Sequence, residues 1–349
     1  MPRTFLVTGA TGFVGSHVAE ALVARGDSVR TLARDGSDTA LLDKLGVTVV
    51  RGDLTDPAAV TRAAEGAQVV IHCGAKVGDW GPVDDYRKVN VEGLRYLLDT
   101  ALEHPVGRFV VVSSLGVYEA RHHFGTDETE PLPDHHIDGY TQSKVEAERL
   151  ALQYHRKQRV PVTILRPGFI YGPRDRSVLP RIAGRLRERS VIYIARGRYA
   201  LNTTYVGNLV DAILLAVDKP EAVGEVFNIT DGEFVPKRRF FETIADGIGA
   251  PRPRGSVPVW LARFIANWRE SVFRRKNKPH PPRATQAQLK FAGLNLDFSI
   301  AKARGRLGYA PRVSFDDGMK AALEWFRKEG GRTAGSRRPF ARSVSPTGH

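Results

Sequence analysis

The sequence has a single cysteine and no long uncharged apolar run. Cys73 alone cannot form an internal disulfide, so packing must hold the fold together, as expected in a reducing compartment. No stretch of about eighteen residues stays apolar and free of charge, and the first residues show no basic segment followed by an apolar one. These absences argue against export and against a membrane-spanning helix. We therefore expect a cytoplasmic protein.

The basic excess of the chain is confined to two segments. The 349 residues include 52 Lys+Arg and 38 Asp+Glu, which gives a formal net charge of +14. Ten basic residues and one acid, Glu270, lie between Arg252 and Lys290, and four arginines without an acid lie between Arg332 and Arg342. These segments hold 13 of the 14 charges. Because the rest is nearly neutral, we predict no nucleic-acid binding.

Short apolar runs alternate with segments of helical periodicity. Strands are predicted at 4–9, 27–33, 47–54, 67–75, 108–114, 160–167 and 223–232, and helices at 14–25, 57–65, 86–102 and 140–156. Near-continuous apolar runs are typical of strands buried on both faces, and parallel neighbours need crossover helices. The pattern predicts an α/β protein with a Rossmann-type, doubly wound parallel sheet.

The rhythm changes after Pro173, where Arg-rich and Pro-rich segments replace the regular alternation. We predict a first domain of residues 1–172 and 203–232 and a smaller substrate domain of residues 173–202 and 233–330. Residues 331–349 have little apolar content and are predicted to form a mobile basic tail.

Three glycines stand between the first predicted strand and the first helix. Glycines here allow a tight turn and close approach of the backbone to a pyrophosphate, which the helix N-terminus attracts. The spacing is G-x-x-G-x-x-G rather than G-x-G-x-x-G, but its placement predicts that the first domain binds a dinucleotide. The candidate cofactor-binding residues in this loop are Gly9, Thr11, Gly12, Phe13, Val14 and Gly15.

The end of the second strand bears on the type of dinucleotide. NAD-preferring enzymes usually place an acid there, whereas this chain has Ala33 followed by Arg34. A guanidinium suits a 2′-phosphate and favours NADP over NAD, although Asp35 follows. Asp53, after the third strand, is a candidate for binding the adenine amine. Alternatively, Asp53 or Asp56 caps the next helix.

Tyr140 and Lys144 lie four residues apart on one face of a predicted helix. A free tyrosine titrates near pH 10, and a close ammonium group stabilises its phenolate, so we expect Lys144 to lower the pKa of Tyr140. Ser113 and Ser114 end the fifth strand. Since adjacent strand residues point to opposite faces, only one of these hydroxyls should face a substrate.

The glycine loop, the strand-end serine and the Tyr-x-x-x-Lys pair, in this order, resemble the extended branch of the short-chain dehydrogenase/reductase superfamily, the NAD-dependent epimerase/dehydratase family, over residues 3–330. Asn90-Val91-Glu92-Gly93 and the run Arg166-Pro167-Gly168-Phe169-Ile170-Tyr171-Gly172-Pro173-Arg174 match further motifs of this branch. Residues 72–81, 302–304 and 307–311 resemble the 3β-hydroxysteroid dehydrogenase group and its 2-alkyl-3-oxoalkanoate reductase relatives.

The resemblance implies site residues and a reaction. It selects Ser114, four residues before Tyr118, as the catalytic serine beside Tyr140 and Lys144, and it implies further cofactor contacts at Leu54, Ala75, Lys144 and Pro167. The implied enzyme is an NAD(P)-dependent oxidoreductase that transfers a hydride between a nicotinamide and a ketone or secondary alcohol.

The substrate is predicted to be apolar. Nucleotide-sugar enzymes of this branch usually carry an arginine at the position of Leu201, although Arg174, Arg196 or Arg198 could replace it. A nucleotide-sugar epimerase or dehydratase is therefore the alternative function. A dinucleotide-binding scaffold without turnover is a second alternative.

Residues 257–275 form one amphipathic stripe with two tryptophans. We favour packing of this stripe on the substrate domain as core or pocket lid, with peripheral membrane contact through 257–276 as the alternative. The resemblance further implies a homodimer that pairs through 86–102 and 140–156. His122, His123, His135 and His136 lack zinc-site spacing and predict a solvated lid rather than a metal site.

Overall fold

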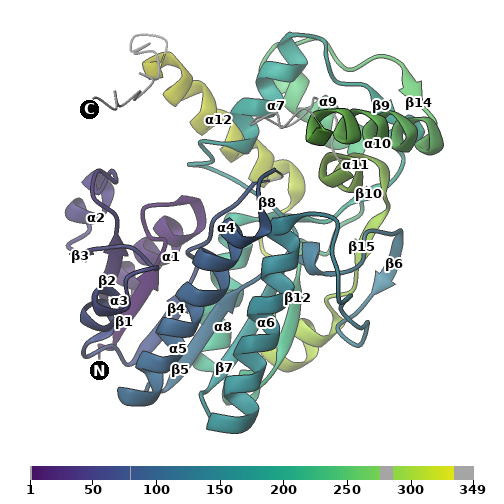
Figure 1. Cartoon of the computed structure of the whole chain (residues 1–349). Coiled ribbons are helices and arrows are strands. Elements are labelled where there is room, and N and C mark those ends of the chain that lie inside the picture. The colour runs from purple at the N-terminus through teal and green to yellow at the C-terminus, as the bar shows by residue number, and fades with distance from the viewer. Residues whose placement is uncertain (1, 79, 276–285, 334–349) are drawn as a thin grey trace, which may run out of the picture.

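The computed structural model describes residues 2–78, 80–275 and 286–333 (Figure 1). Its centre is a seven-stranded, fully parallel sheet with the strand order β12-β7-β5-β4-β1-β2-β3. The strands are β1 (Thr4–Thr8), β2 (Ser28–Ala33), β3 (Thr48–Arg51), β4 (Val69–His72), β5 (Arg108–Val112), β7 (Val162–Pro167) and β12 (Val226–Ile229). All seven predicted strands are confirmed, and so is the doubly wound α/β fold.

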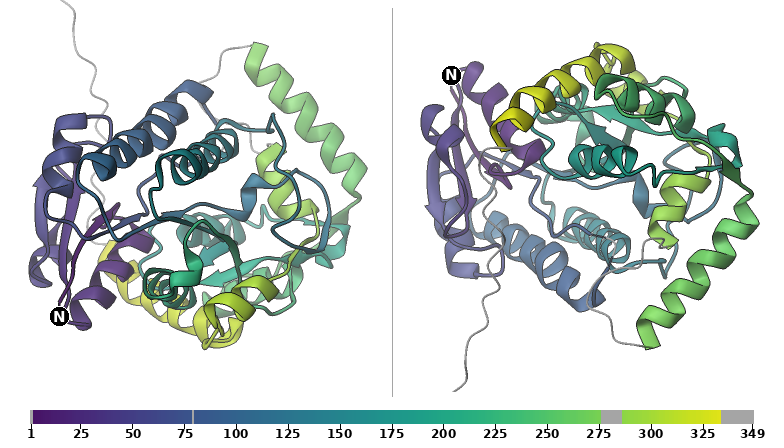
Figure 2. Two further views of the ribbon diagram at one scale, coloured as in Figure 1. Left: turned by 90° about the horizontal axis from the view of Figure 1, so that it is seen from below. Right: turned by 90° about the horizontal axis from the view of Figure 1, so that it is seen from above.

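Helices cover both faces of this sheet (Figure 2). One hydrophobic core joins the sheet to α1 (Phe13–Ala24) and α8 (Val206–Asp218). A second core lies on the opposite face, under α3 (Pro57–Ala64), α5 (Gly93–Glu103) and α6 (Gly139–Gln158). Strands such as β4 and β5 are buried along their full length, which explains their uninterrupted apolar sequences.

Local signals set several of these helix boundaries. Asp56 caps α3, because its side chain accepts from the backbone N–H groups of Ala58 and Ala59, and Pro57 occupies the first helical position. Asp138 caps α6 by accepting from Thr141 N at 2.8 Å. The predicted helix at 86–102 is instead three segments, namely α4 (Val83–Arg87), the π-helical turn η1 (Lys88–Glu92) and α5.

The remaining chain forms small sheets and helices beyond the carboxyl ends of the large sheet. The two-stranded pairs are β8 (Phe169–Tyr171) with β11 (Thr203–Tyr205), β10 (Ala200–Leu201) with β13 (Val235–Pro236), β9 (Tyr193–Ile194) with β14 (Ser256–Val257) and β6 (His123–Thr126) with β15 (Leu296–Phe298). The helices are α7 (Val178–Arg187), α9 (Lys237–Gly247), α10 (Val259–Arg275), α11 (Gln286–Gly293) and α12 (Phe315–Thr333). A third hydrophobic core lies within this part.

Short elements complete the chain. These are α2 (Ala40–Lys44) and the turns η2 (Leu115–Val117), η3 (Ala195–Gly197), η4 (Pro220–Ala222) and η5 (Ala303–Leu307). The segment containing Ala303, Leu307 and Tyr309 packs into the core beside α1 and α8, although it follows the predicted substrate domain in sequence. Residues predicted to belong to the substrate domain therefore pack against the first domain at this segment.

Two sequence expectations change in this region. The predicted tail begins too early, because 331–333 are the last residues of α12, while 334–349 lie outside the described residues. Trp260, Phe264 and Trp268 of α10 are exposed rather than packed as core or pocket lid. No helix in the described part of the chain is long and apolar enough to cross a membrane.

Candidate active site

The glycine loop lies where the strand order reverses, between β1 and β4. Gly9 has a φ of +73°, and a Cβ on it would lie 2.8 Å from the Cα of Gly74, at the end of β4. A Cβ on Gly15 would lie 2.3 Å from the carbonyl oxygen of Gly9. Both positions therefore require glycine. Open parallel sheets bind ligands at such a reversal point.

The loop leaves the amino end of α1 open. Gly12 is the N-cap residue, without a side-chain cap, and Thr11 and Gly12 are exposed while Phe13 and Val14 are half-buried. Backbone N–H groups and the positive end of the helix dipole consequently face the crevice. Because glycines remove every Cβ that would fill this cradle, the residues present fit the pyrophosphate of a dinucleotide.

Basic side chains gather beside the ends of β2 and β3. Ala33 is buried and Arg34 is exposed, and Arg51, the register partner of Ala33, donates through Nη1 to the carbonyl oxygen of Arg34 at 3.2 Å. The sequence pointed to Arg34 and missed Arg51. Asp35 is exposed as well, so an acid remains close to this pair.

Asp53 is half-buried, and its carboxylate accepts from the backbone N–H and the hydroxyl of Thr55 at 2.9 and 2.8 Å. Since Asp56 caps α3, the capping alternative applies to Asp56 and not to Asp53. Leu54 packs against the crevice glycines, because a Cβ on Gly74 would come within 2.9 Å of its Cδ1. Leu54 thus lies beside the ends of β1 and β4, and the cofactor-binding roles of Asp53 and Leu54 stay predictions.

The two adjacent serines have separate environments. Ser113 is buried, and its hydroxyl donates to the Glu148 carboxylate at 2.5 Å. Ser114 is half-buried, and its Oγ accepts from the backbone N–H of Gly116 at 3.0 Å, which leaves its own proton for another acceptor. This separation supports the choice of Ser114 over Ser113.

Tyr140 and Lys144 occupy the first two turns of α6, which packs against the end of β5. The Lys144 ammonium donates to the carbonyl oxygen of Val112, two residues before Ser114, at 3.0 Å. The ring of Tyr140 lies edge-on to that of Tyr86, with centroids 6.5 Å apart. The residues predicted to be catalytic therefore come from neighbouring elements at the carboxyl edge of the sheet. Ala75 follows β4 at the same edge, and Pro167 is the last residue of β7.

The pKa values of this pair differ from the sequence expectation. Burial raises the pKa of Tyr140 to about 12, and the Asp138 carboxylate acts in the same direction. Burial lowers the pKa of Lys144 to about 8, although the carboxylate of Glu148 and the thiol of Cys73 oppose this shift. The predicted lowering of the tyrosine pKa is thus wrong, because desolvation and the Asp138 carboxylate both raise it.

Asn90 ties the loop after β4 to the catalytic helix. Its side chain accepts from the Lys76 backbone N–H at 2.7 Å and donates to the Lys76 carbonyl at 3.0 Å and to Ser143 Oγ at 2.9 Å. The Ser143 hydroxyl in turn donates to the carbonyl of Tyr140. Asn90 lies in the π-helical turn η1, and such turns are frequent at functional sites.

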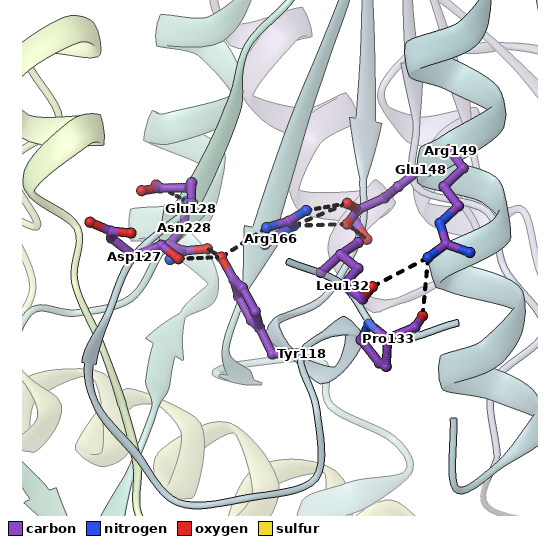
Figure 3. A network of polar contacts seen from close by, with 10 residues as sticks. Tyr118, Asp127, Glu128, Leu132, Pro133, Glu148, Arg149, Arg166 and Asn228 are labelled. Atoms are coloured by element: carbon purple, nitrogen blue, oxygen red, sulfur yellow. Dashed lines mark hydrogen bonds and ion pairs between the residues drawn. The ribbon is translucent and has the colours of Figure 1, made fainter. Parts of the chain in front are cut away.

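A buried polar network lies behind the serines (Figure 3). Arg166, on β7, makes several bonds to the Glu148 carboxylate, the shortest at 2.6 Å, and the two side chains are 5% and 1% exposed. Arg166 Nη1 also donates to the Tyr118 hydroxyl at 2.8 Å, and that hydroxyl donates to Asn228 Oδ1 at 2.9 Å. The network joins β5, β7, β12 and α6 at the end that carries the site.

A half-buried lysine of α11 contacts the loop after Ser114. Lys290 Nζ donates to the carbonyl oxygens of Gly116 and Tyr118, at 2.5 and 3.1 Å. It also lies 3.3 Å from Nε2 of His136, which itself contacts the Tyr118 carbonyl at 2.9 Å. Burial lowers the pKa of Lys290 to about 8. Apart from its charge, nothing in the sequence pointed to this lysine.

The four candidate histidines do not share one site. His123 is buried and bonds through its ring to Glu119 O and Thr126 Oγ1, whereas His136 bonds to the loop before α6. His135 is exposed, and His122 stacks edge-on with Tyr199 at 4.7 Å. These contacts fit a structured loop, so the predicted solvated lid is only partly correct.

The position where the resemblance to nucleotide-sugar enzymes would imply an arginine is apolar. Leu201 is 1% exposed and belongs to the third hydrophobic core. Arg174, one of the predicted substitutes for a missing arginine, pairs with Glu20 on α1 at 2.7 Å. Arg198 lies over the ring of Tyr199, and Arg196 is exposed. None of these contacts places a cation at the position of Leu201.

Comparisons with known proteins agree with this geometry. The model of the NAD dependent epimerase/dehydratase family matches residues 5–230. The chain is 32% identical over 320 residues to a 4-hydroxy-2-methyl-3-oxo-4-farnesyl-3,4-dihydroquinoline-1-oxide ketoreductase of Stigmatella aurantiaca, covering 91% of this chain and 95% of that protein.

Two further relatives cover nearly the whole chain. A 2-alkyl-3-oxoalkanoate reductase of Stenotrophomonas maltophilia is 33% identical over 326 residues, covering 90% of this chain and 97% of that one. A crystal structure described as gox2253 superposes with a TM-score of 0.80 at 30% identity, covering 95% of this chain and 99% of that one.

Proposed function

Because the chain belongs to the NAD-dependent epimerase/dehydratase family, as an oxidoreductase of the short-chain dehydrogenase/reductase type, we propose that it is an NADPH-dependent ketoreductase of apolar 3-oxo substrates. The observation that carries this proposal is the combination of Ser114, Tyr140 and Lys144 at one sheet edge with Leu201 in a hydrophobic core. The first feature provides for carbonyl reduction, and the second argues against a diphosphate-bearing substrate.

Each of the three side chains has a separate role in carbonyl reduction. The nicotinamide, when bound, supplies the hydride. Ser114 donates a hydrogen bond to the substrate carbonyl oxygen, and Tyr140 gives that oxygen its proton. A tyrosine whose pKa is raised to about 12 remains protonated at neutral pH, which suits the role of proton donor. Lys144, whose ammonium donates to the Val112 carbonyl at the same sheet edge, would hold the nicotinamide ribose.

The preference for the phosphorylated cofactor is supported by two arginines. Arg34 is exposed after β2, and Arg51 reaches the Arg34 carbonyl from β3, so two arginines stand at the strand end where Rossmann folds recognise the 2′-substituent. NADPH as cofactor implies the direction of ketone reduction.

The names of two relatives support the substrate class. The Stigmatella aurantiaca protein is a ketoreductase of a farnesylated quinoline oxide, and the Stenotrophomonas maltophilia protein is a reductase of 2-alkyl-3-oxoalkanoates. Both names describe a carbonyl next to a large apolar group. A 3-oxoalkanoate or a 3-ketosteroid therefore represents the class that we propose for this chain.

The test is a cofactor-oxidation screen at 340 nm with the purified protein. We expect oxidation of NADPH, faster than that of NADH, with 3-oxoalkanoates or 3-ketosteroids. The Arg34→Ala substitution should raise the KM for NADPH about tenfold and leave that for NADH nearly unchanged. Tightly retained NAD⁺ with no net absorbance change, together with turnover of a nucleotide-sugar, would replace this proposal by the epimerase or dehydratase alternative.

A further inference from the structure

Helix α10 presents a row of large aromatic side chains to solvent. Trp260, Phe264 and Trp268 are 69%, 67% and 61% exposed. Their spacing of four residues places them along one side of the helix. An exposed row of this kind is unusual on a soluble protein and marks a surface that contacts something else.

Buried and half-buried residues of α10 attach the helix to the protein. Ala266 is 1% exposed, and Leu261 and Ile265 are half-buried. The helix lies at the outer edge of the molecule next to α11, on the side away from β1–β3 (Figure 2). Because other residues attach the helix, the three aromatic side chains are available for a partner without any rearrangement of the fold.

The charge around this row identifies the partner. Arg263 and Arg275 of α10 are exposed, and the chain from Arg252 to Lys290 contains ten basic residues and one acid. Two copies of so basic a segment repel one another, whereas an anionic lipid surface attracts it. Tryptophan and phenylalanine beside arginine are typical of helices that lie in the headgroup layer of a bilayer.

We propose that α10 is a membrane-surface helix. It binds in the plane of an anionic bilayer, with Trp260, Phe264 and Trp268 in the headgroup layer and Arg263 and Arg275 beside the lipid phosphates. This contact does not depend on the proposed ketoreductase activity, because it rests on exposure and charge alone.

The position of α10 connects the membrane contact with substrate entry. This second inference rests on the proposed function. Helix α10 packs on α11, whose Lys290 bonds to the loop after Ser114. On the same helix, the ring of Phe291 lies 4.9 Å from that of Phe169. A bilayer under α10 therefore borders the helix that contacts the loop after Ser114, and an apolar substrate would enter from lipid on this side.

Cosedimentation of the full-length protein with vesicles tests the contact. We expect binding to vesicles of phosphatidylglycerol and phosphatidylcholine at a ratio of about 1:1, at least tenfold weaker binding to pure phosphatidylcholine, and release by about 0.5 M salt. The variant carrying Trp260→Ser, Phe264→Ser and Trp268→Ser should bind anionic vesicles at least tenfold more weakly.

The matched control is Phe234→Ser, which removes a 60% exposed aromatic side chain outside α10 and should leave vesicle binding unchanged. The midpoint of urea unfolding reports on the fold of each variant separately and should stay unchanged in all of them. Failure of every ketone substrate would not affect these measurements, so the two proposals fail independently.

Three results would overturn the proposal. These are absence of vesicle binding by the parent protein at low salt, equal binding by the triple variant and the parent, and a concentration-dependent dimer that the triple substitution abolishes without any vesicle binding. The last result would assign α10 to a second copy of the chain.

Discussion

Ser113 and Ser114 are adjacent in sequence but have different roles, because they follow a strand that ends at the candidate active site. The fifth strand turns Ser113 toward the buried Glu148 and leaves Ser114 half-buried. Sequence alternation alone predicts that only one of them faces the substrate, but it does not say which one. The resemblance to known enzymes selected Ser114, and the hydrogen bond from Ser113 to Glu148 supplies the physical reason.

Alanine substitutions separate the two serines. We expect Ser114→Ala to lower kcat about 10²-fold with little change in stability, because a hydrogen bond to the reacting oxygen is lost. Ser113→Ala should cost about 1–3 kcal/mol of unfolding free energy, because a hydrogen bond to a buried carboxylate is lost. Its kcat should stay within about threefold of the parent. Steady-state kinetics and urea unfolding measure both, and the reverse pattern would assign the catalytic hydroxyl to Ser113.

At the scale of elements, the sequence predicted what depends on local pattern. The seven strands of the large sheet follow from their apolar runs, and Asp56 with Pro57 marks the start of α3. The π-helical turn around Asn90 was not predictable, because its periodicity is that of an uninterrupted helix. The exposed side of α10 was not predictable either, since an amphipathic pattern does not tell which neighbour, if any, covers each apolar row.

The Glu148–Arg166 pair joins β5, β7 and α6, so its loss should affect both stability and catalysis. Glu148→Gln leaves a buried guanidinium without its counter-charge and should cost about 3–5 kcal/mol of unfolding free energy. Since the Glu148 carboxylate raises the pKa of Lys144 against the effect of burial, its removal should lower that pKa below about 8. The alkaline limb of the kcat profile should then move to lower pH.

The control for this prediction lies on the same helix. Glu146 pairs with Arg87 at 2.7 Å, with side chains that are 24% and 43% exposed, so Glu146→Gln should cost less than about 1 kcal/mol and leave the alkaline limb in place. Glu148→Asp keeps the charge and covers the case in which Glu148→Gln does not fold. An unchanged alkaline limb in a folded Glu148→Gln variant would contradict the assigned role.

For the whole molecule, the burial of several histidines determines how the free energy of unfolding changes in mild acid. Burial lowers the pKa of His17 to about 4 and that of His72 to about 3, and it also lowers the pKa values of His122, His123 and His136. Unfolded histidines bind protons below about pH 6.5. Between that pH and about 4 the unfolded chain therefore binds more protons than the native one, so the free energy of unfolding must decrease as the pH falls.

We expect His17 and His72 each to remove about 2 kcal/mol of stability between pH 7 and pH 5, as measured by urea unfolding without cofactor. Carboxylates whose pKa the fold lowers, such as those of Glu146 and Glu225, lose their stabilising effect only at lower pH, so comparison of histidine variants in this interval reports on the histidines. His72→Asn should make the pH dependence shallower, whereas His104→Gln, at an exposed position, should leave it unchanged. If the free energy of unfolding stayed constant from pH 7 to pH 5, these imidazoles would take up protons in the folded protein as they do in the unfolded one. That result would contradict a neutral His72, whose Nδ1 lies 2.8 Å from Thr8 Oγ1 beside the glycine loop.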